Sequence, residues 1–191
     1  MSMERQARPV TLAWSNPVVR WWGFLSFVSA ANIAIWFALY RQFHEQSNGS
    51  FSNTSGIGLM MLLCAAYVFG CAFRSVLPRA DVQRICLFDH WLSSVMVGRT
   101  VATVAEVCFA AQWAIILHQL GTMTGAETTV NIAWTIVPLI VIAECFSWYA
   151  VLTTHYLCNA IENSIWAVVF FLVGIALCRL LPEFQIGRAH V

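Results

Sequence analysis

Long apolar runs are the feature that most constrains how this chain folds. The run from Trp21 to Tyr40 contains no charged side chain at all. Further apolar runs cover residues 57–73, 91–118, 130–152 and 164–181. A helix that crosses a bilayer needs about 20 predominantly apolar residues, so each run is long enough or nearly so. The pattern therefore predicts an all-α fold, a multi-pass transmembrane helical bundle with about five spans.

The composition agrees with a membrane location and excludes some function classes. Only 10% of the residues are charged, whereas about 25% is usual in soluble domains. All ten basic residues are arginines, and they form no basic run, so nucleic acid is not an expected partner. The absence of lysine also excludes a retinal Schiff base within this sequence. The expected partner is the lipid bilayer, together with a lipid or a small apolar substrate. The sequence does not identify a cofactor or the oligomeric state.

The distribution of arginines predicts the orientation of the spans. The loop after the second apolar run contains Arg74, Arg79 and Arg84, and cytoplasmic loops are enriched in basic residues. We therefore expect this loop and the polar segment 1–20 to lie on the cytoplasmic side. The loop between the first two runs then lies outside. It contains two sequons that begin at Asn48 and Asn53, which are candidate glycosylation sites. The plasma membrane and the endomembranes are not distinguished.

Local signals predict how the spans begin, end and pack. Ala66 and Gly70 form a small-xxx-small pair, which favours close helix approach. The third helix is expected to start near Ile85, before it crosses the membrane. Residues 153–163 are expected to form a short amphipathic connection on the inner side. Pro182 is expected to end the fifth span.

The last residues differ in character from the rest of the chain. In one reading frame, the sequencing adapter ATCGGAAGAGCACACGTC translates to the final hexapeptide Ile-Gly-Arg-Ala-His-Val, and a stop codon follows it. We therefore expect residues 185–191 to be a non-native tail on a truncated chain. Such a tail is excluded from the fold prediction, which covers a bundle over 21–184.

Three charged residues lie inside the predicted spans, and they are the candidate functional site. Arg99 and Glu106 lie in the third span, and Glu144 lies in the fourth. A charged side chain near the bilayer centre costs about 2.5–3.5 kcal/mol on insertion scales, so it is usually paired and faces the bundle interior. Glu106 is two helical turns from Arg99, beyond the favourable i,i+4 spacing. We therefore expect each charge to have a partner on another helix.

The depths of these residues suggest which ones pair. If the third span is centred near residue 104 and the fourth near 141, Arg99 and Glu144 lie at a similar depth on antiparallel helices. We predict an Arg99–Glu144 pair, either as an interhelical ion pair that fixes packing or as part of a functional site. Glu106 is then left without an ionic partner and is expected to carry a proton, which suits acid–base work.

A second polar group is predicted at the cytoplasmic mouth of the bundle. Asp89 and His90 begin the third helix, and His155 and Glu162 follow the fourth. Histidine and carboxylate are suitable metal ligands, but no HxxxH or HExxH spacing supports a metal site, and we predict none.

Two principal function classes fit these residues, and a third needs no chemistry. The first is a membrane-embedded enzyme that acts on a lipid or another apolar substrate, with Glu106 as acid–base group and Arg99 and Glu144 holding a polar head or each other. The second is a transporter, channel or sensor that uses the same charges as an ion or proton path or switch. The third is a structural membrane subunit whose buried pair serves only packing.

Overall fold

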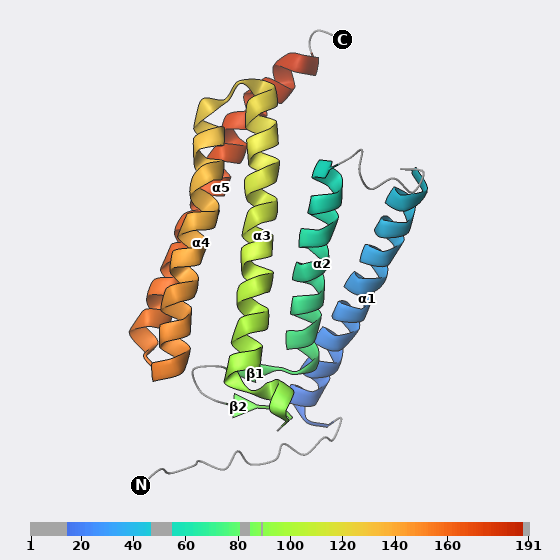
Figure 1. The fold of residues 1–191 in the computed structure, drawn as a ribbon, viewed down its shortest axis with the longest axis vertical. Coiled ribbons are helices and arrows are strands. Elements are labelled where there is room, and N and C mark those ends of the chain that lie inside the picture. The colour runs from blue at the N-terminus through green and yellow to red at the C-terminus, as the bar shows by residue number, and fades with distance from the viewer. Residues whose placement is uncertain (1–14, 47–54, 81–84, 89, 189–191) are drawn as a thin grey trace. The chain divides into compact units, whose positions relative to one another are not determined.

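The computed structural model describes residues 15–46, 55–80, 85–88 and 90–188, and its fold is helical (Figure 1). The helices are α1 (Pro17–Gln46), α2 (Ser55–Val76), α3 (Val95–Thr124), α4 (Glu127–Thr153) and α5 (Tyr156–Arg188). Two short elements precede α3: a two-residue antiparallel strand pair, β1 (Arg79–Ala80) and β2 (Ile85–Cys86), and the 3₁₀ turn η2 (Trp91–Ser93). The predicted all-α class is confirmed.

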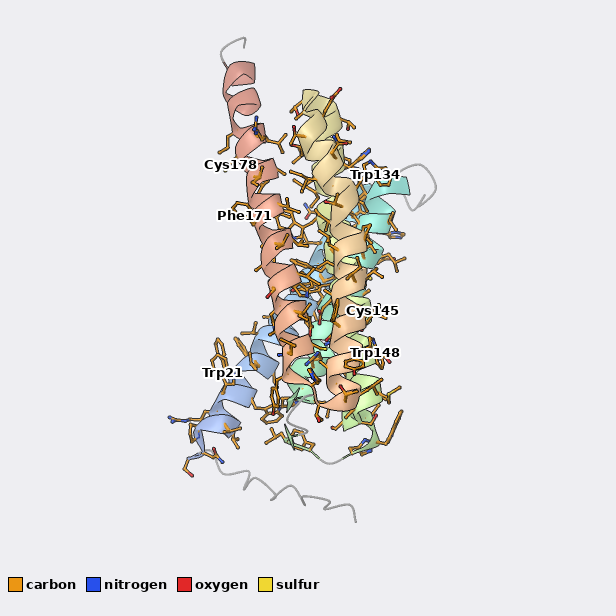
Figure 2. The ribbon with its side chains drawn as sticks, turned by 90° about the vertical axis from the view of Figure 1, so that its left-hand side faces the viewer. Trp21, Trp134, Cys145, Trp148, Phe171 and Cys178 are labelled. Carbon is orange, nitrogen blue, oxygen red and sulfur yellow. The ribbon has the colours of Figure 1, made fainter. Side chains whose placement is uncertain are left out.

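All five helices are long enough and apolar enough to cross a membrane. They contain 22 to 33 residues, which corresponds to about 33 to 50 Å at a rise of about 1.5 Å per residue. The hydrocarbon core of a bilayer is about 30 Å thick, so each helix exceeds it. Large apolar side chains such as Phe27, Trp134 and Phe171 are exposed, as expected for helices whose outer faces meet lipid. Figure 2 shows Phe171 on α5 and Trp134 on α4.

The chain divides into two compact units, Met1–Ala105 and Glu106–Val191. In the first unit, α1 packs against α2. Two tryptophans of α1 donate hydrogen bonds from Nε1 to backbone carbonyls: Trp36 to Met61 at 3.3 Å and Trp22 to Val76 at 3.1 Å. The Trp36 ring also contacts Phe69 edge to face, with ring centroids 5.6 Å apart. Aromatic contacts and indole hydrogen bonds therefore join these two helices.

Gly70 allows close helix packing in the first unit. A Cβ atom placed on Gly70 would lie 2.7 Å from the Cβ atom of Ala105, nearer than side chains tolerate. Only glycine fits at this point. The close approach predicted from Ala66 and Gly70 is confirmed at Gly70.

The second unit contains the main hydrophobic core, formed by α4, α5 and the part of α3 from Glu106 onward. Leu117, Ile136, Ile140, Ala176 and Leu180 are almost completely buried there. The α4 residues of this core recur at the spacing of a single helix face, and α4 packs against α5 along that face. This face also contains Glu144.

The turns of the second unit use two special backbone conformations. Gly125, with φ of 71°, joins α3 to α4, and glycine adopts this conformation without strain. Thr154, with φ of 57° and ψ of 36°, joins α4 to α5, and its backbone N–H donates to the carbonyl of Ala150. Left-handed residues of this kind commonly end helices.

Three predicted boundaries were wrong. The segment before α3 is a strand pair and a 3₁₀ turn rather than a helix from Ile85, because Ser94 caps α3 by accepting a hydrogen bond from Val97 N at 3.4 Å. The connection predicted at 153–163 is a turn at Thr154 and His155, since the left-handed Thr154 reverses the chain at once. The helix α5 also continues past Pro182 to Arg188, because a proline removes one helical hydrogen bond without necessarily ending the helix.

The start of α1 also differs from the prediction. The helix begins at Pro17, within the segment predicted as a polar extension over 1–20. Asn16 Oδ1 accepts a hydrogen bond from Val18 N at 3.0 Å, and Pro17 follows at the first helical position. Asparagine is a favoured N-cap residue, and proline is favoured directly after it, so this start has a local cause.

Candidate carboxyl cluster in the second unit

Three glutamates from three helices meet inside the second unit. Glu106 lies on α3, Glu144 on α4 and Glu162 on α5, and one carboxylate oxygen from each lies within 4.8 Å of the others. Glu144 is 3% exposed and Glu162 is 8% exposed, while Glu106 is partly buried. We call this group the carboxyl cluster. Such a set of oxygen ligands could hold a metal ion.

The observed helix bounds explain why these three residues meet. Glu106 lies about 5 Å from the middle of α3, on the side of its amino end. Glu144 lies about 6 Å from the middle of α4, on the side of the α4–α5 turn. Glu162 is in the second turn of α5, next to the same turn. Since α4 runs antiparallel to both neighbours, all three side chains lie in the same half of the bundle.

This arrangement corrects the expectation for Glu106. The predicted span over 91–118 places Glu106 beyond its middle, apart from other charges. The helix in fact runs from Val95 to Thr124, which moves its middle toward the carboxyl end and leaves Glu106 in the amino-terminal half. Glu106 therefore lies beside two other carboxyl groups rather than alone.

Glu162 was assigned to the predicted mouth group, but it is buried in the carboxyl cluster. The misplacement follows from the wrong boundary at 153–163. Because α5 begins at Tyr156, Glu162 lies inside a helix and not in a connecting segment. The three glutamates lie on three different helices and form no local sequence motif. Their meeting can therefore be predicted only when the ends of those helices are placed correctly.

The other predicted mouth residues are separate from the carboxyl cluster. His90 is exposed, and its Nδ1 accepts a hydrogen bond from Leu92 N at 3.3 Å, which caps η2. His155 is exposed in the α4–α5 turn, with its ring centroid 6.3 Å from that of Tyr149. Asp89 and the sequon residues Asn48 and Asn53 lie outside the described residues.

Arg99 lies in the second turn of α3, in the first unit, and is 4% exposed. A buried guanidinium group needs compensation by an acceptor or a negative charge. Its predicted pairing with Glu144 would join residues of different units, and it stays a prediction.

Ser147 lies one turn after Glu144 on the buried face of α4 and is 1% exposed. Its Oγ atom is buried without a hydrogen-bond partner among the residues that the structure describes. An unsatisfied buried polar group costs about 1–3 kcal/mol, so this hydroxyl calls for an explanation. Sequence reasoning had not singled out Ser147, because a lone serine in an apolar helix has no distinctive spacing.

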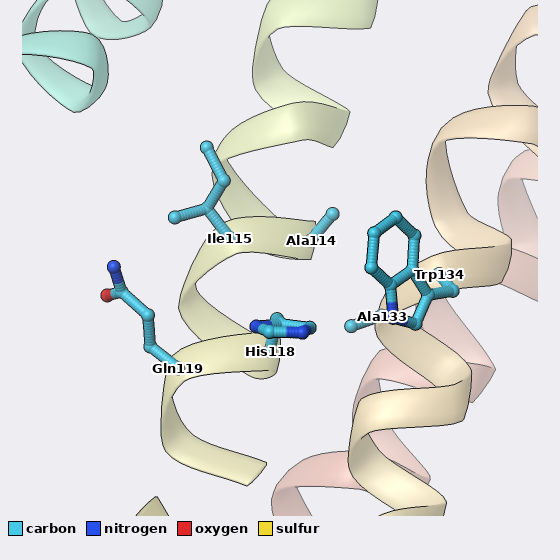
Figure 3. A pocket seen from close by; sticks show the side chains of 6 residues that line it. All are labelled: Ala114, Ile115, His118, Gln119, Ala133 and Trp134. Atoms are coloured by element: carbon cyan, nitrogen blue, oxygen red, sulfur yellow. The ribbon is translucent and has the colours of Figure 1, made fainter. Parts of the chain in front are cut away.

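A separate cavity of about 280 Å³ lies in the other half of the second unit, between α3 and α4 (Figure 3). Its lining is mostly apolar, with Ala114, Ile115 and Ala133, and Trp134 lies at one edge. His118 and Gln119 supply its polar groups. The His118 ring meets Trp134 edge to face, with centroids 5.5 Å apart.

No protein family, curated protein or solved structure matches this chain. The chemistry of the carboxyl cluster and of the cavity is therefore the basis for assigning a function.

Proposed function

We propose that this chain is a multi-pass integral membrane protein that passes protons or other cations through the carboxyl cluster. The observation that carries the proposal is the meeting of three glutamates within 4.8 Å, on three helices that are each apolar enough to span a membrane. Carboxylates inside spans are rare and typical of ion paths and proton relays.

Charge balance supports a cation-exchanging site. Three ionised carboxylates at this spacing repel one another, and burial of Glu144 and Glu162 strengthens the repulsion by removing water. The carboxyl cluster is favourable only when protons, a cationic side chain or a metal ion offset its charge. Uptake and release of a cation would change the repulsion between α3, α4 and α5, which couples occupancy to helix packing.

The sequence-based orientation adds a direction to this proposal. With the amino terminus on the cytoplasmic side, the carboxyl cluster lies in the cytoplasmic half of the bundle, and cations reach it from that side first. The choice between a transporter or channel and a sensor depends on whether the cation also leaves on the outer side.

Flux measurements on reconstituted protein test this proposal. The chain is inserted into lipid vesicles that contain a pH-sensitive dye, and a pH step is applied outside. We expect proton flux above that of empty vesicles, with at least a tenfold loss in Glu106→Gln and Glu162→Gln. The matched control is Glu127→Gln, because Glu127 is exposed in the first turn of α4, away from the carboxyl cluster. Equal flux in all four proteins would contradict the proposal.

A membrane-embedded enzyme is the second candidate, and the cavity between α3 and α4 favours it. A cavity of about 280 Å³ with an apolar lining and two polar side chains suits part of a lipid or another apolar molecule. The carboxyl cluster would then supply acid–base groups. Conversion of vesicle lipids, followed by mass spectrometry and lost in Glu106→Gln without any proton flux, would favour this candidate over the first.

A further inference from the structure

We infer that the carboxyl cluster and Ser147 together bind one hard divalent cation, of the class of Mg²⁺, Mn²⁺ and Ca²⁺. This inference rests on the proposed function, because it names the cation that the carboxyl cluster takes. Two independent observations carry it: the spacing of the three carboxylates and the state of the Ser147 hydroxyl.

The spacing of the carboxylates matches the size of such an ion with its ligands. Hard divalent cations hold oxygen ligands at about 2.0–2.6 Å, so ligands on opposite sides of one ion are about 4–5 Å apart. The carboxylate oxygens of Glu106, Glu144 and Glu162 all lie within 4.8 Å of one another. One ion therefore fits among them with no more than small side-chain movements.

The Ser147 hydroxyl lacks the hydrogen bond that three other helical serines make, a state that it shares with the hydroxyls of Ser26 and Thr129 among the described residues. Ser29, Ser75 and Ser164 each donate to the carbonyl four residues earlier, at 2.8 to 2.9 Å. This bond is the usual way in which serine satisfies its hydroxyl inside a helix. Within the described part of the chain, Ser147 Oγ has no such bond, although it is almost fully buried. Its hydroxyl is therefore available to a ligand.

Helix geometry directs this hydroxyl toward the carboxyl cluster. Ser147 follows Glu144 by three residues, so both lie on one face of α4. The Cα–Cβ bond of a helical residue tilts toward the amino end of the helix, which for Ser147 is the side of Glu144. Figure 2 labels Cys145 and Trp148, which directly follow Glu144 and Ser147 in the sequence, and shows them about one turn apart on α4.

The donor set selects the class of cation. Carboxylate and hydroxyl oxygens are hard ligands, which suit Mg²⁺, Ca²⁺ and Mn²⁺ rather than a soft ion such as Cu⁺. Serine hydroxyls serve as Mg²⁺ ligands in nucleotide-binding loops. A divalent ion also offsets more of the negative charge of the three carboxylates than a monovalent ion does. No metal site was predicted from the sequence, because these ligands come from three helices without a local motif.

Titration with Mn²⁺ tests the inference. The chain is held in lipid nanodiscs, and the concentration of free Mn²⁺ is measured by electron paramagnetic resonance. We expect one bound Mn²⁺ per chain, with competition by Mg²⁺ or Ca²⁺. Ser147→Ala and Glu162→Gln should each weaken binding by at least about tenfold, and Glu127→Gln should not change it. Binding should strengthen as pH rises, because protons and the cation compete for the same oxygens.

A measurement on the unmodified chain makes the test independent of variant folding. Mn²⁺ at saturating concentration should raise its thermal midpoint, and EDTA should reverse the rise. Absence of a bound Mn²⁺ and of this rise, or unchanged Mn²⁺ affinity in folded Ser147→Ala, would overturn the inference. If Mn²⁺ fails to bind while proton flux persists and depends on Glu106, only the metal assignment falls. If both are absent, the proposed function falls as well.

Discussion

Single residues determine how closely the helices of the second unit approach one another. A Cβ atom on Gly121 would lie 2.8 Å from a methyl group of Val130 and 3.1 Å from its backbone nitrogen. Backbone atoms cannot move away as a flexible side chain does, so the α3–α4 contact requires glycine there. A Cβ atom placed on Gly174, in α5, would meet no atom within 4 Å. The two glycines therefore form a matched pair for testing this packing.

We predict that Gly121→Val destabilises the chain by about 1–3 kcal/mol, the usual effect of overpacking. Gly174→Val should leave stability within about 0.5 kcal/mol, since a Cβ atom at this position has no neighbour within 4 Å. The measurement is equilibrium unfolding in mixed detergent micelles, followed by loss of helical circular dichroism. Equal stability of the two variants would show that α3 and α4 do not approach as described.

At the scale of elements, the ends of the helices decided what the sequence could predict. Apolar length identified all five helices, because the membrane requirement is a property of whole segments. The ends depend on single caps and turns. Ser94 begins α3, and Thr154 ends α4 in a left-handed conformation that threonine rarely adopts. Misplacing these ends shifted the expected depth of Glu106 and put Glu162 in a loop, so the carboxyl cluster was not predictable as a group.

The turn at Thr154 gives a prediction at this scale. A non-glycine residue in the left-handed region carries about 1 kcal/mol of backbone strain, which glycine avoids. We expect Thr154→Gly to raise the free energy of unfolding by about that amount. Thr153→Gly, one residue earlier and inside α4, should lower it by roughly 0.3–0.5 kcal/mol, because glycine has a poorer helix propensity than threonine. Thermal melting of both variants checks the opposite signs, and the same sign for both would refute the account of this turn.

For the whole molecule, the remaining question is which side of the membrane each end faces. The arginines of the loop after α2 predict that this loop and the amino terminus face the cytoplasm, with the sequons at Asn48 and Asn53 outside. The orientation of the spans in the membrane depends on the distribution of basic residues between the loops and not on how the helices pack, so the fold does not determine it.

Translation in the presence of microsomes tests this orientation. We expect glycosylation at Asn48 or Asn53, seen as an increase in apparent mass that a glycosidase removes. Replacement of both asparagines by glutamine should abolish it. As a complementary control, a sequon engineered next to Arg79 should remain unmodified. Glycosylation of the sequon engineered next to Arg79, without glycosylation of Asn48 or Asn53, would show the opposite orientation.

We propose above that the carboxyl cluster holds exchangeable cations inside the bundle. Infrared difference spectroscopy between acidic and alkaline pH tests it most directly, because protonated carboxyl groups have their own C=O absorption. In lipid nanodiscs, we predict a titrating carboxyl band from a buried environment that shrinks in Glu106→Gln and in Glu162→Gln but persists in Glu127→Gln. An identical band in all of these proteins, or no titrating buried carboxyl band in the unmodified chain, would contradict the claim.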